Sequence, residues 1–342
     1  PHGLLQELGG IVIVTKTPFR VSFFGGGTDF PAWYEEHGGS VISTAINKYC
    51  YISIRPLPPF FDYKYRIVYS DTELVKKVDE IKHPSVRETF RHLEVKAGIE
   101  IHHFSDLPAK SGLGSSSSFT VGLINAVKAL EGKLLDARNM AEMAIHIEQE
   151  LIKEACGSQD QVAASYGGLN KITFQQSGKF LGDPLVIPDR NRDDLERGLC
   201  LFFTGVSRFS DEIERDKINN LKEKESFLCA IQEQVGRVEK LLTSKSFTLC
   251  DFGHELHDMW LSKWALSKKV SNERIDEIYK KALSVGAYGG KILGAGGGGF
   301  LLFCIEPWLK TKLIEAIYPL IHVPFRFDYE GSKVALYAPN GH

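Results

Sequence analysis

Apolar residues alternate with polar ones over much of the first hundred residues, and many of them are β-branched, which predicts strands. The run IVIVTKTPFRVSFF, which begins at Ile11, contains two β-rich stretches separated by Pro18. The glycines of GGGTD then permit a tight turn. Further strands are expected at 41–46, 49–54, 65–69 and 98–103.

The periodicity changes after residue 118, where apolar residues recur three and four positions apart. This spacing predicts a helix over 119–130 that ends near Gly132, and a second helix from the N-cap Asp136 to about residue 155. The segment CGSQDQ follows as a loop. The remaining elements are expected to be strands at 167–174, 198–203, 300–305 and 333–337, and helices at 210–242, 252–267, 272–285 and 307–321.

The order of these elements indicates the fold class. Strands and helices are mixed without the strict alternation of βαβ units, which favours an α+β fold. The polar stretch at 175–195 is a candidate linker, and 342 residues are enough for two domains. We therefore expect an N-terminal domain over 11–185 and a C-terminal domain over 186–342.

The composition of the chain argues against several classes of binding partner. The chain has 41 Lys and Arg residues and 43 Asp and Glu residues, a net charge of −2, which argues against binding to nucleic acid. The six cysteines form no CxxC pair, so no zinc site is expected, and their dispersion is typical of reduced thiols in the cytoplasm. No uncharged apolar run reaches ~18 residues, so no membrane span is predicted. Residues 1–10 lack the features of a signal peptide.

An anion-binding site must then be local, and the segment PAKSGLGSSSS over 108–118 has the composition of one. Two glycines let the backbone approach a ligand, and the run of four serines at 115–118 offers hydroxyl donors. The helix that follows directs its free N–H groups and positive dipole end toward the segment. The spacing is not that of a Walker A loop. The segment favours a phosphate-binding site, with a flexible serine-rich linker as the alternative.

Two other glycine segments carry weaker signals. In PFRVSFFGGGTD, Arg20 lies between apolar residues of a strand, where a buried guanidinium needs an anionic partner. Asp29 follows the glycines and could accept hydrogen bonds from the paired hydroxyls of a sugar, although a hairpin turn with a surface aspartate is the simpler explanation. In GAGGGGF, four glycines before an apolar strand suggest a backbone pressed against another segment, although a bulge would also need glycine.

Two carboxylates could complete a site for phosphoryl transfer. Glu148 lies on the second predicted helix, near the edge of its apolar stripe, and Asp160 lies in the loop that follows. Mg²⁺ prefers one or two carboxylates together with phosphate oxygens, and a carboxylate beside the acceptor hydroxyl can act as a base. On spacing alone, two ordinary solvated acids explain the pattern better.

Taken together, PFRVSFFGGGTD, PAKSGLGSSSS and KILGAGGGGF resemble, in order and separation, the three motifs of the GHMP kinase superfamily. This superfamily includes galactokinase, homoserine kinase, mevalonate kinase and phosphomevalonate kinase. The resemblance extends from about Thr17 to Phe300. It implies a two-domain α+β fold, with an N-terminal domain like domain 2 of ribosomal protein S5, a ferredoxin-like C-terminal domain and an active site between them. It also implies ATP and Mg²⁺ as cofactors.

The resemblance implies a role for each motif residue. Asp160 matches the catalytic aspartate, and Arg20 matches the basic residue that keeps this aspartate ionised and stabilises the transferred charge. Ser116 and Glu148 match the ligands of Mg²⁺. The nucleotide would contact Lys110, Ser111, Gly112, Leu113, Gly114, Ser115, Ser116 and Ser117. The acceptor would contact Gly26, Gly27, Thr28, Asp29 and Gly297.

Within the superfamily, TPFRVSFFGGGTDFP and GGSVISTAINKY look like the sugar-1-kinase branch. That branch includes D-glycero-D-manno-heptose 7-phosphate kinases and the kinase part of bifunctional fucokinases. Galactokinases carry Gly-Glu-His-Thr-Asp where this chain has Gly-Gly-Gly-Thr-Asp, which leaves room for a bulkier or phosphorylated sugar. The implied reaction is the phosphorylation of a sugar by ATP at its anomeric hydroxyl, with D-glycero-D-manno-heptose 7-phosphate converted to the 1,7-bisphosphate.

A distal phosphate on the sugar would require cations of its own. Lys48, Lys171 and Arg208 are the candidates, although each alone is more simply explained as a surface cation. A fucose-type or other hexose 1-kinase is the alternative enzyme. A non-catalytic GHMP-fold ligand-binding protein and a decarboxylase of the diphosphomevalonate type are alternatives of other classes. The implied partners are small molecules in the cytoplasm, and a homodimer is compatible with the sequence.

Overall fold

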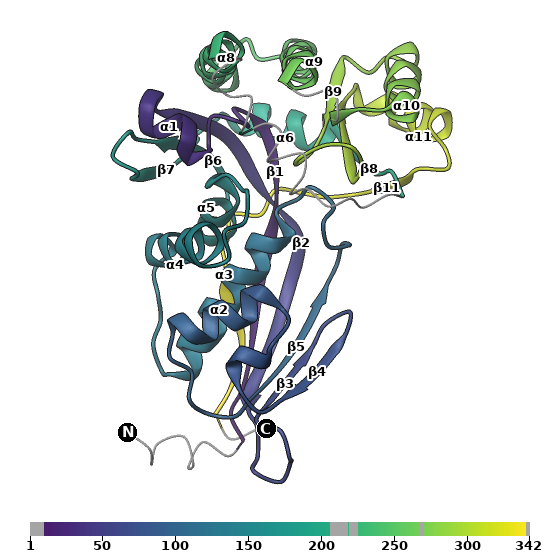
Figure 1. The fold of residues 1–342 in the computed structure, drawn as a ribbon. Coiled ribbons are helices and arrows are strands. Elements are labelled where there is room, and N and C mark those ends of the chain that lie inside the picture. The colour runs from purple at the N-terminus through teal and green to yellow at the C-terminus, as the bar shows by residue number, and fades with distance from the viewer. Residues whose placement is uncertain (1–9, 206–217, 219–224, 267–269, 340–342) are drawn as a thin grey trace.

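The computed structural model describes residues 10–205, 218, 225–266 and 270–339. A long mixed sheet, with helices against one face, forms the larger part of the molecule, and a smaller sheet with its own helices lies beyond one end of it (Figure 1). The fold is the α+β fold that the sequence predicts, because the two sheets are separate and helices are not interleaved strictly with parallel strands.

Eight strands form the first sheet, and two long ones run through its centre. The long strands are β1 (Val12–Phe24) and β2 (Gly39–Pro56). The strand order is β12–β1–β2–β5–β3–β4, and β6 pairs with the other end of β2 and with β7. The remaining bounds are β3 (Tyr65–Val68), β4 (Thr72–Val75), β5 (Ile99–Ser105), β6 (Leu169–Phe174), β7 (Phe180–Pro184) and β12 (Lys333–Ala338).

Pro18 does not separate two strands, as the sequence suggested, but lies inside β1. The register between β1 and β2 shifts between Pro18 and Phe19, and pairing continues on both sides of the shift. Proline has no N–H to donate to the ladder and is found in sheets mainly at edges and bulges. The shift in register therefore allows the proline to lie within a continuous strand.

A group of helices and a π-helical turn covers one face of the first sheet, in part by direct contact with its strands and in part by packing on other helices of the group. The bounds of these elements differ in part from prediction. The predicted second helix ends early as α4 (Ala137–Ile145), continues as a π-turn over His146–Leu151, and is followed by α5 (Gln159–Tyr166), so CGSQDQ is not wholly a loop. The helix α2 (Pro84–His92) was not predicted. The helix α3 (Ser115–Leu130) begins within the serine run, four residues earlier than expected.

The smaller sheet is antiparallel, in the order β11–β8–β10–β9, with helices packed against it. Its β11 lies at the end of the stretch predicted to be helical over 307–321. The predicted linker at 175–195 contains β7 and the start of the helix α6 (Asp189–Gly198). The first part of the predicted helix 210–242 lies outside the described residues. The bounds of these strands and helices are β8 (Leu199–Phe203), β9 (Gly289–Ile292), β10 (Phe300–Cys304), β11 (Ile321–Val323), α9 (Leu249–Leu266), α10 (Glu273–Ser284) and α11 (Lys310–Ala316). The remaining helices are α1 (Pro31–His37), α6 and α8 (Glu225–Thr243), of which α8 packs against β2 of the first sheet and against α9.

The C-terminal strand returns to the first sheet. β12 pairs antiparallel with β1, with Val12 opposite Ala338, so the last part of the chain adds an edge strand to the N-terminal layer. A single division of the chain at residue 185 stays a prediction, and it would place this strand with the smaller sheet.

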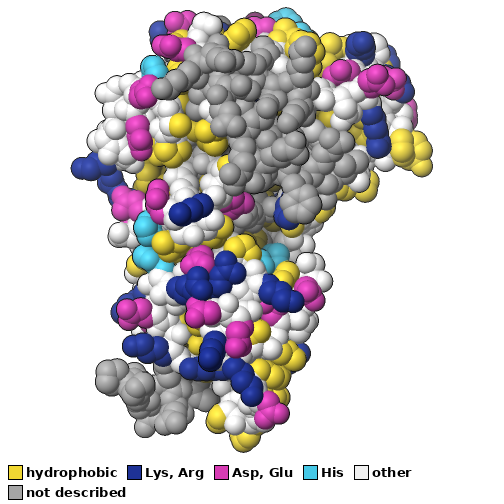
Figure 2. All heavy atoms as spheres, viewed as in Figure 1, with side chains coloured by type: hydrophobic (Ala, Val, Ile, Leu, Met, Phe, Trp, Pro, Cys, Tyr) yellow, Lys and Arg dark blue, Asp and Glu magenta, His cyan; other side chains and the backbone are white. Residues whose placement is uncertain are grey.

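The distribution of charge on the surface agrees with the small net charge of the chain. On the face shown in Figure 2, Lys and Arg side chains lie close to Asp and Glu side chains over the lower half of the molecule. No helix in the described part of the chain is both long and apolar enough to cross a membrane.

One aromatic cluster joins the two parts of the molecule. The ring of Phe252, on α9, packs edge-on against Phe23 and Phe24 at the end of β1, with centroids 5.6 and 5.5 Å apart. All three side chains are completely buried, and they belong to one core that contains residues of both sheets. Aromatic burial of this kind is a large apolar contribution to stability.

We predict that Phe252→Ala lowers the free energy of unfolding by about 3–5 kcal/mol, because it leaves a cavity between the sheets. Urea denaturation followed by circular dichroism measures the loss. Phe227→Ala on α8, whose side chain is 43% exposed, is the matched control and should change stability by less than about 0.5 kcal/mol. Equal effects of the two substitutions would contradict the assigned role of Phe252.

Candidate active site

The second and third glycine segments of the sequence touch one another in space, and the first lines the same cavity. A Cβ atom on Gly112 would lie 2.6 Å from the carbonyl oxygen of Leu293, and one on Gly294 would lie 2.4 Å from the Cα of Gly112. A Cβ on Gly299 would lie 2.2 Å from the carbonyl oxygen of Ser111. The third segment is therefore pressed against the second at a distance that only glycine permits.

The serine run forms the first turn of a long helix, and this N-terminal end of the helix faces a cavity. Gly114, the N-cap of α3, has a left-handed backbone with φ of 75°, and no side chain caps the helix. Ser115, Ser116 and Ser117 line the cavity. Uncapped N–H groups and the positive dipole end of a helix of 16 residues make this end of the cavity suited to phosphate.

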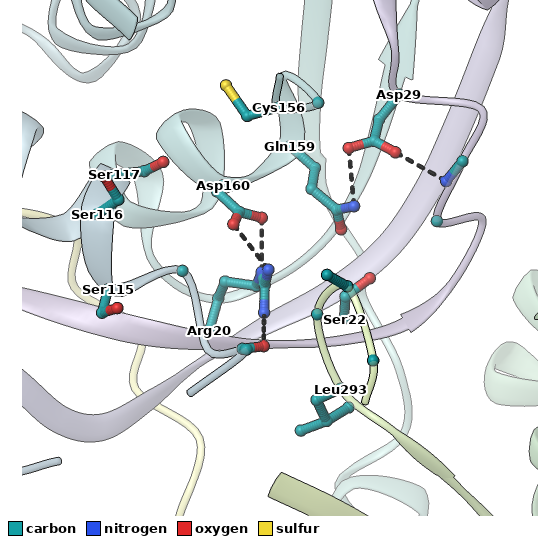
Figure 3. Close-up of a pocket in the computed structure, with 18 of the residues that line it drawn as sticks. Arg20, Ser22, Asp29, Ser115, Ser116, Ser117, Cys156, Gln159, Asp160 and Leu293 are labelled. Carbon is teal, nitrogen blue, oxygen red and sulfur yellow. Dashed lines mark hydrogen bonds and ion pairs between the residues drawn. The ribbon is translucent and has the colours of Figure 1, made fainter. Parts of the chain in front are cut away.

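An ion pair lies at the centre of the cavity wall (Figure 3). The Nε and Nη2 atoms of Arg20, on β1, donate to the two carboxylate oxygens of Asp160, each over 2.7 Å, and Nη1 donates to the carbonyl oxygen of Gly112 over 2.7 Å. The Arg20 side chain is 6% exposed and that of Asp160 is 24% exposed. The guanidinium is thus fully engaged, whereas the carboxylate still faces the cavity.

Asp160 has this position because a helix starts beside it. It lies in the first turn of α5, where a carboxylate is favourable to the helix dipole. A Cβ on Gly114 would lie only 3.3 Å from the Oδ2 of Asp160, so the phosphate segment approaches the carboxylate closely.

Glu148 lies in the π-turn and is almost completely buried. Its Oε2 accepts hydrogen bonds from the hydroxyl of Ser117 over 2.8 Å and from the amide of Gln161 over 2.5 Å. Its Oε1 has no hydrogen-bond partner among the described residues. Burial, with a further contribution from the charge of Glu154, raises the pKa of Glu148 to about 7.

The GGGTD turn closes the cavity on the other side. Asp29 is 3% exposed; its Oδ1 accepts from the backbone N–H of Gly27 over 2.9 Å, and its Oδ2 accepts from the amide of Gln159 over 2.8 Å. A Cβ on Gly157 would lie 1.9 Å from that Oδ2. The CGSQDQ segment can therefore contact the turn only because it carries glycine at this position.

Comparisons with known proteins agree with this arrangement. The N-terminal domain of GHMP kinases, as a family model, matches residues 74–168, and the GHMP kinase C-terminal model matches residues 246–307. The D-glycero-alpha-D-manno-heptose 7-phosphate kinase of Campylobacter jejuni is 32% identical to this chain, over 89% of the chain and 93% of that protein. The chain belongs to the GHMP kinase family.

Two other similarities extend the comparison. The bifunctional fucokinase/GDP-fucose pyrophosphorylase of Arabidopsis thaliana is 25% identical, over 87% of this chain and 30% of that protein. The crystal structure of a D-glycero-D-manno-heptose 1-phosphate kinase from Bacteroides thetaiotaomicron has a TM-score of 0.76 at 22% identity, covering 94% of this chain and 97% of that one. These findings confirm the predicted GHMP fold, and this GHMP kinase is an ATP-dependent phosphotransferase.

Most of the predicted site residues of this kinase line one cavity. They are Arg20, Gly26, Gly27, Asp29, Lys110, Ser111, Gly112, Gly114, Ser115, Ser116, Ser117, Glu148 and Asp160. Leu113 lies behind them, completely buried, and its carbonyl oxygen accepts from the N–H of Arg20 over 3.0 Å. The hydroxyl of Thr28 donates to the carbonyls of Gly25 and Ser40 within the turn, which indicates a structural role.

Other predicted residues lie away from the cavity lining. Lys171 is paired with Glu239 of α8 over 2.7 Å, and Lys48 also lies outside the lining. Gly297 is buried, with its N–H donated to the carbonyl of Val270 over 2.7 Å, while its neighbours Gly296 and Gly298 line the cavity. Arg208 lies outside the described residues.

Two lysines of the cavity were missed. Lys291, 3% exposed, donates to the carbonyls of Ser22 and Phe23, over 3.1 and 2.7 Å, and Lys263, 7% exposed, donates to the carbonyls of Ile292 and Gly294. Lys291 stands in KILGAGGGGF, so its place beside the glycine run was the available signal.

The donor set fits a magnesium ion. A buried carboxylate oxygen without a partner, beside serine hydroxyls at the start of a helix, is a hard-oxygen environment of the kind that Mg²⁺ prefers when it also binds phosphate. The hydroxyl of Ser117 donates to Glu148, whereas Ser116, the predicted magnesium ligand, is exposed to the cavity. Ser117 therefore orients the carboxylate and leaves Ser116 available to a ligand.

We predict that metal-free protein loses stability as the pH rises from 5 to 8. An acid whose pKa is raised to about 7 by folding, from an ordinary 4.5, binds more protons in the folded state within this window, so its protonation stabilises the fold at pH 5 and not at pH 8. The loss attributable to Glu148 is at most roughly 3 kcal/mol. Urea denaturation in the presence of a chelator, at both pH values, measures it.

Glu148→Gln should show a flatter pH dependence, and Mg²⁺ at pH 8 should stabilise the wild type more than this variant. The exposed Glu150→Gln, two residues away, is the control and should keep the wild-type dependence. Identical pH dependence in all three proteins would show that the proton of Glu148 is not linked to folding.

Proposed function

We propose that this kinase phosphorylates the anomeric hydroxyl of a sugar, and that its substrate is D-glycero-D-manno-heptose 7-phosphate, which it converts to the 1,7-bisphosphate. The observation that carries the proposal is the Arg20–Asp160 pair, which lies between the phosphate segment and the GGGTD turn. The Campylobacter jejuni relative, a heptose 7-phosphate kinase, supports the choice of sugar.

The nucleotide side of the reaction needs donors and positive potential. The triphosphate of ATP would lie at the N-terminus of α3, against Lys110 and the backbone of the glycine segment, with its γ-phosphoryl group toward Arg20. The hydroxyl of Ser115 already accepts from the N–H of Lys110 over 3.0 Å, which shapes the segment around the helix end. In this arrangement the protein stabilises phosphate charge by preorganised dipoles.

The acceptor side needs a group that takes a proton. Asp160 would accept the hydrogen bond of the sugar's reacting hydroxyl and remove its proton as the oxygen attacks phosphorus. Arg20 would hold the carboxylate in position through two hydrogen bonds and offset the charge that develops on the transferred group. Phosphoryl transfer depends mainly on such positioning and electrostatics, so no covalent intermediate with the protein is required.

Glu148 and Ser116 are the residues that would hold Mg²⁺. Bound there, the ion would neutralise negative charge on the phosphates of ATP. Ser117 and Gln161 would keep the Glu148 carboxylate in place through their hydrogen bonds to its Oε2.

The sugar's distal phosphate requires positive charge on the acceptor side. Lys48 and Lys171 lie outside the cavity lining, which disfavours them, whereas Lys263 and Lys291 lie within it. The two lysines of the smaller sheet and its helix are therefore the better candidates among the described residues. A fucose-type or other hexose 1-kinase is the second candidate function, favoured by the similarity to the Arabidopsis thaliana fucokinase.

Asp160→Asn should lower kcat about 10²- to 10⁴-fold, because the amide cannot accept the proton, while the affinity for ATP stays within about threefold. Steady-state kinetics and calorimetric titration with ATP measure the two quantities. The exposed Asp183→Asn on β7 is the control and should behave as wild type. Turnover near the wild-type value in Asp160→Asn would refute the role of Asp160.

A substrate panel tests the sugar. Heptose 7-phosphate should have a kcat/KM at least about tenfold above that of fucose, mannose, galactose and the unphosphorylated heptose, because a built phosphate subsite favours the charged sugar. Phosphorus NMR of the product should place the new phosphate on the anomeric carbon. A preference for fucose would replace the proposed substrate by the second candidate.

A further inference from the structure

Gln159 is a buried polar side chain in the cavity wall with one hydrogen-bonding group unused. It is 8% exposed and lines the cavity as the first residue of α5. Its Nε2 donates to Asp29, whereas its Oε1 is buried and has no hydrogen-bond partner among the described residues. A buried carbonyl oxygen without a donor is unfavourable and is rare in folded proteins.

The orientation of this amide is fixed by its neighbour. A carboxylate oxygen of Asp29 can only accept a hydrogen bond, so the group of Gln159 that faces it, 2.8 Å away, must be the amide nitrogen. The carbonyl oxygen is consequently turned away from Asp29. In Figure 3 it points from between Asp160 and Asp29 toward the space above Ser22 and Leu293.

Asp29 and its surroundings hold the amide rigidly. The N–H of Ser158 donates to the backbone carbonyl of Asp29 over 2.9 Å, and the absent Cβ of Gly157 lets the two segments touch. The Oδ1 of Asp29 is held in turn by the N–H of Gly27. The start of α5 and the GGGTD turn therefore act as one frame that presents the carbonyl oxygen of Gln159 to the cavity.

We propose that Gln159 determines acceptor specificity: its Oε1 accepts a hydrogen bond from the hydroxyl next to the one that is phosphorylated. The inference rests on the proposed function, in which the adjacent residue Asp160 binds the reacting hydroxyl. Because the two side chains follow one another in the first turn of α5 and both line the cavity, they would contact neighbouring hydroxyls of one sugar. The substrate class is then a sugar with a vicinal diol at carbons 1 and 2.

The test combines a variant with a substrate analogue. The acceptor is the sugar that wild-type enzyme turns over best in the panel, compared with its 2-deoxy analogue. Wild type should lose about 10- to 100-fold in kcat/KM with the analogue, since the buried carbonyl then stays without a donor. Gln159→Met, which keeps the length of the side chain and removes the amide, should treat both sugars alike.

The KM for ATP should stay within about twofold in Gln159→Met, while the KM for the intact sugar rises about tenfold or more. The exposed Gln175→Met, beyond the end of β6, is the matched control and should discriminate between the sugars as wild type does. Undiminished discrimination in Gln159→Met would overturn the inference. If that variant does not fold, the wild type alone decides, because equal use of the 2-deoxy analogue would also overturn it.

The outcomes separate this inference from the proposed function. If wild type phosphorylates no sugar, the proposed function fails and the role of Gln159 falls with it. If wild type phosphorylates a sugar other than heptose 7-phosphate, the comparison with the 2-deoxy analogue of that sugar still tests Gln159. Retained discrimination in the variant, with normal sugar turnover in wild type, rejects only the role of Gln159.

Discussion

The ion pair between Arg20 and Asp160 is the interaction on which the rest of the site depends. A guanidinium buried on a central strand is unfavourable unless its donors are satisfied, and here three of its nitrogens bond to two different segments. Two bonds fix the start of α5, and the third, to Gly112, fixes the phosphate segment. A residue of β1 thereby sets the separation between the nucleotide side and the acceptor side of the cavity. The same contacts that compensate for burying a charge also create the geometry that phosphoryl transfer requires.

A second constraint comes from the absence of side chains where backbones meet. Gly112 and Gly294 face one another, and Gly299 faces the carbonyl of Ser111, at distances that no Cβ would tolerate. Through these contacts the loop between β9 and β10 of the smaller sheet packs against the backbone of the phosphate segment. Lys291 adds two hydrogen bonds from the smaller sheet to the carbonyls at the end of β1. The smaller sheet is therefore part of the active site, although most of the residues that would take part directly in phosphoryl transfer lie on the larger part of the molecule.

Features that follow from local residue patterns and from the order of motifs could be predicted from the sequence. Features that depend on contacts between residues far apart in the chain could not. The α+β class, the phosphate segment and the family followed from periodicity and from three motifs in order. Pro18 was mistaken for a strand end because the bulge that accommodates it requires β2 as a partner. The helix α6 was mistaken for a linker because only three of its residues are buried, which leaves a weak apolar pattern. Lys171 was predicted to bind the substrate because its ion-pair partner, Glu239, lies 68 residues away in the chain and could not be recognised from the sequence.

Asp29 shows most clearly how structure changes an interpretation from sequence. Its carboxylate follows a glycine turn, as a sugar-binding aspartate would, yet both of its oxygens accept hydrogen bonds from the protein, one of them from a residue 130 positions away. A buried carboxylate held in this way is a rigid acceptor, and it can orient an amide without ambiguity, because an amide must face it with nitrogen. The amide carbonyl oxygen that faces away from Asp29 can only accept a hydrogen bond, so a ligand group beside it must be a donor such as a hydroxyl. The carboxylate of Asp29 thus orients the amide of Gln159, and in the proposed role that amide selects the hydroxyl.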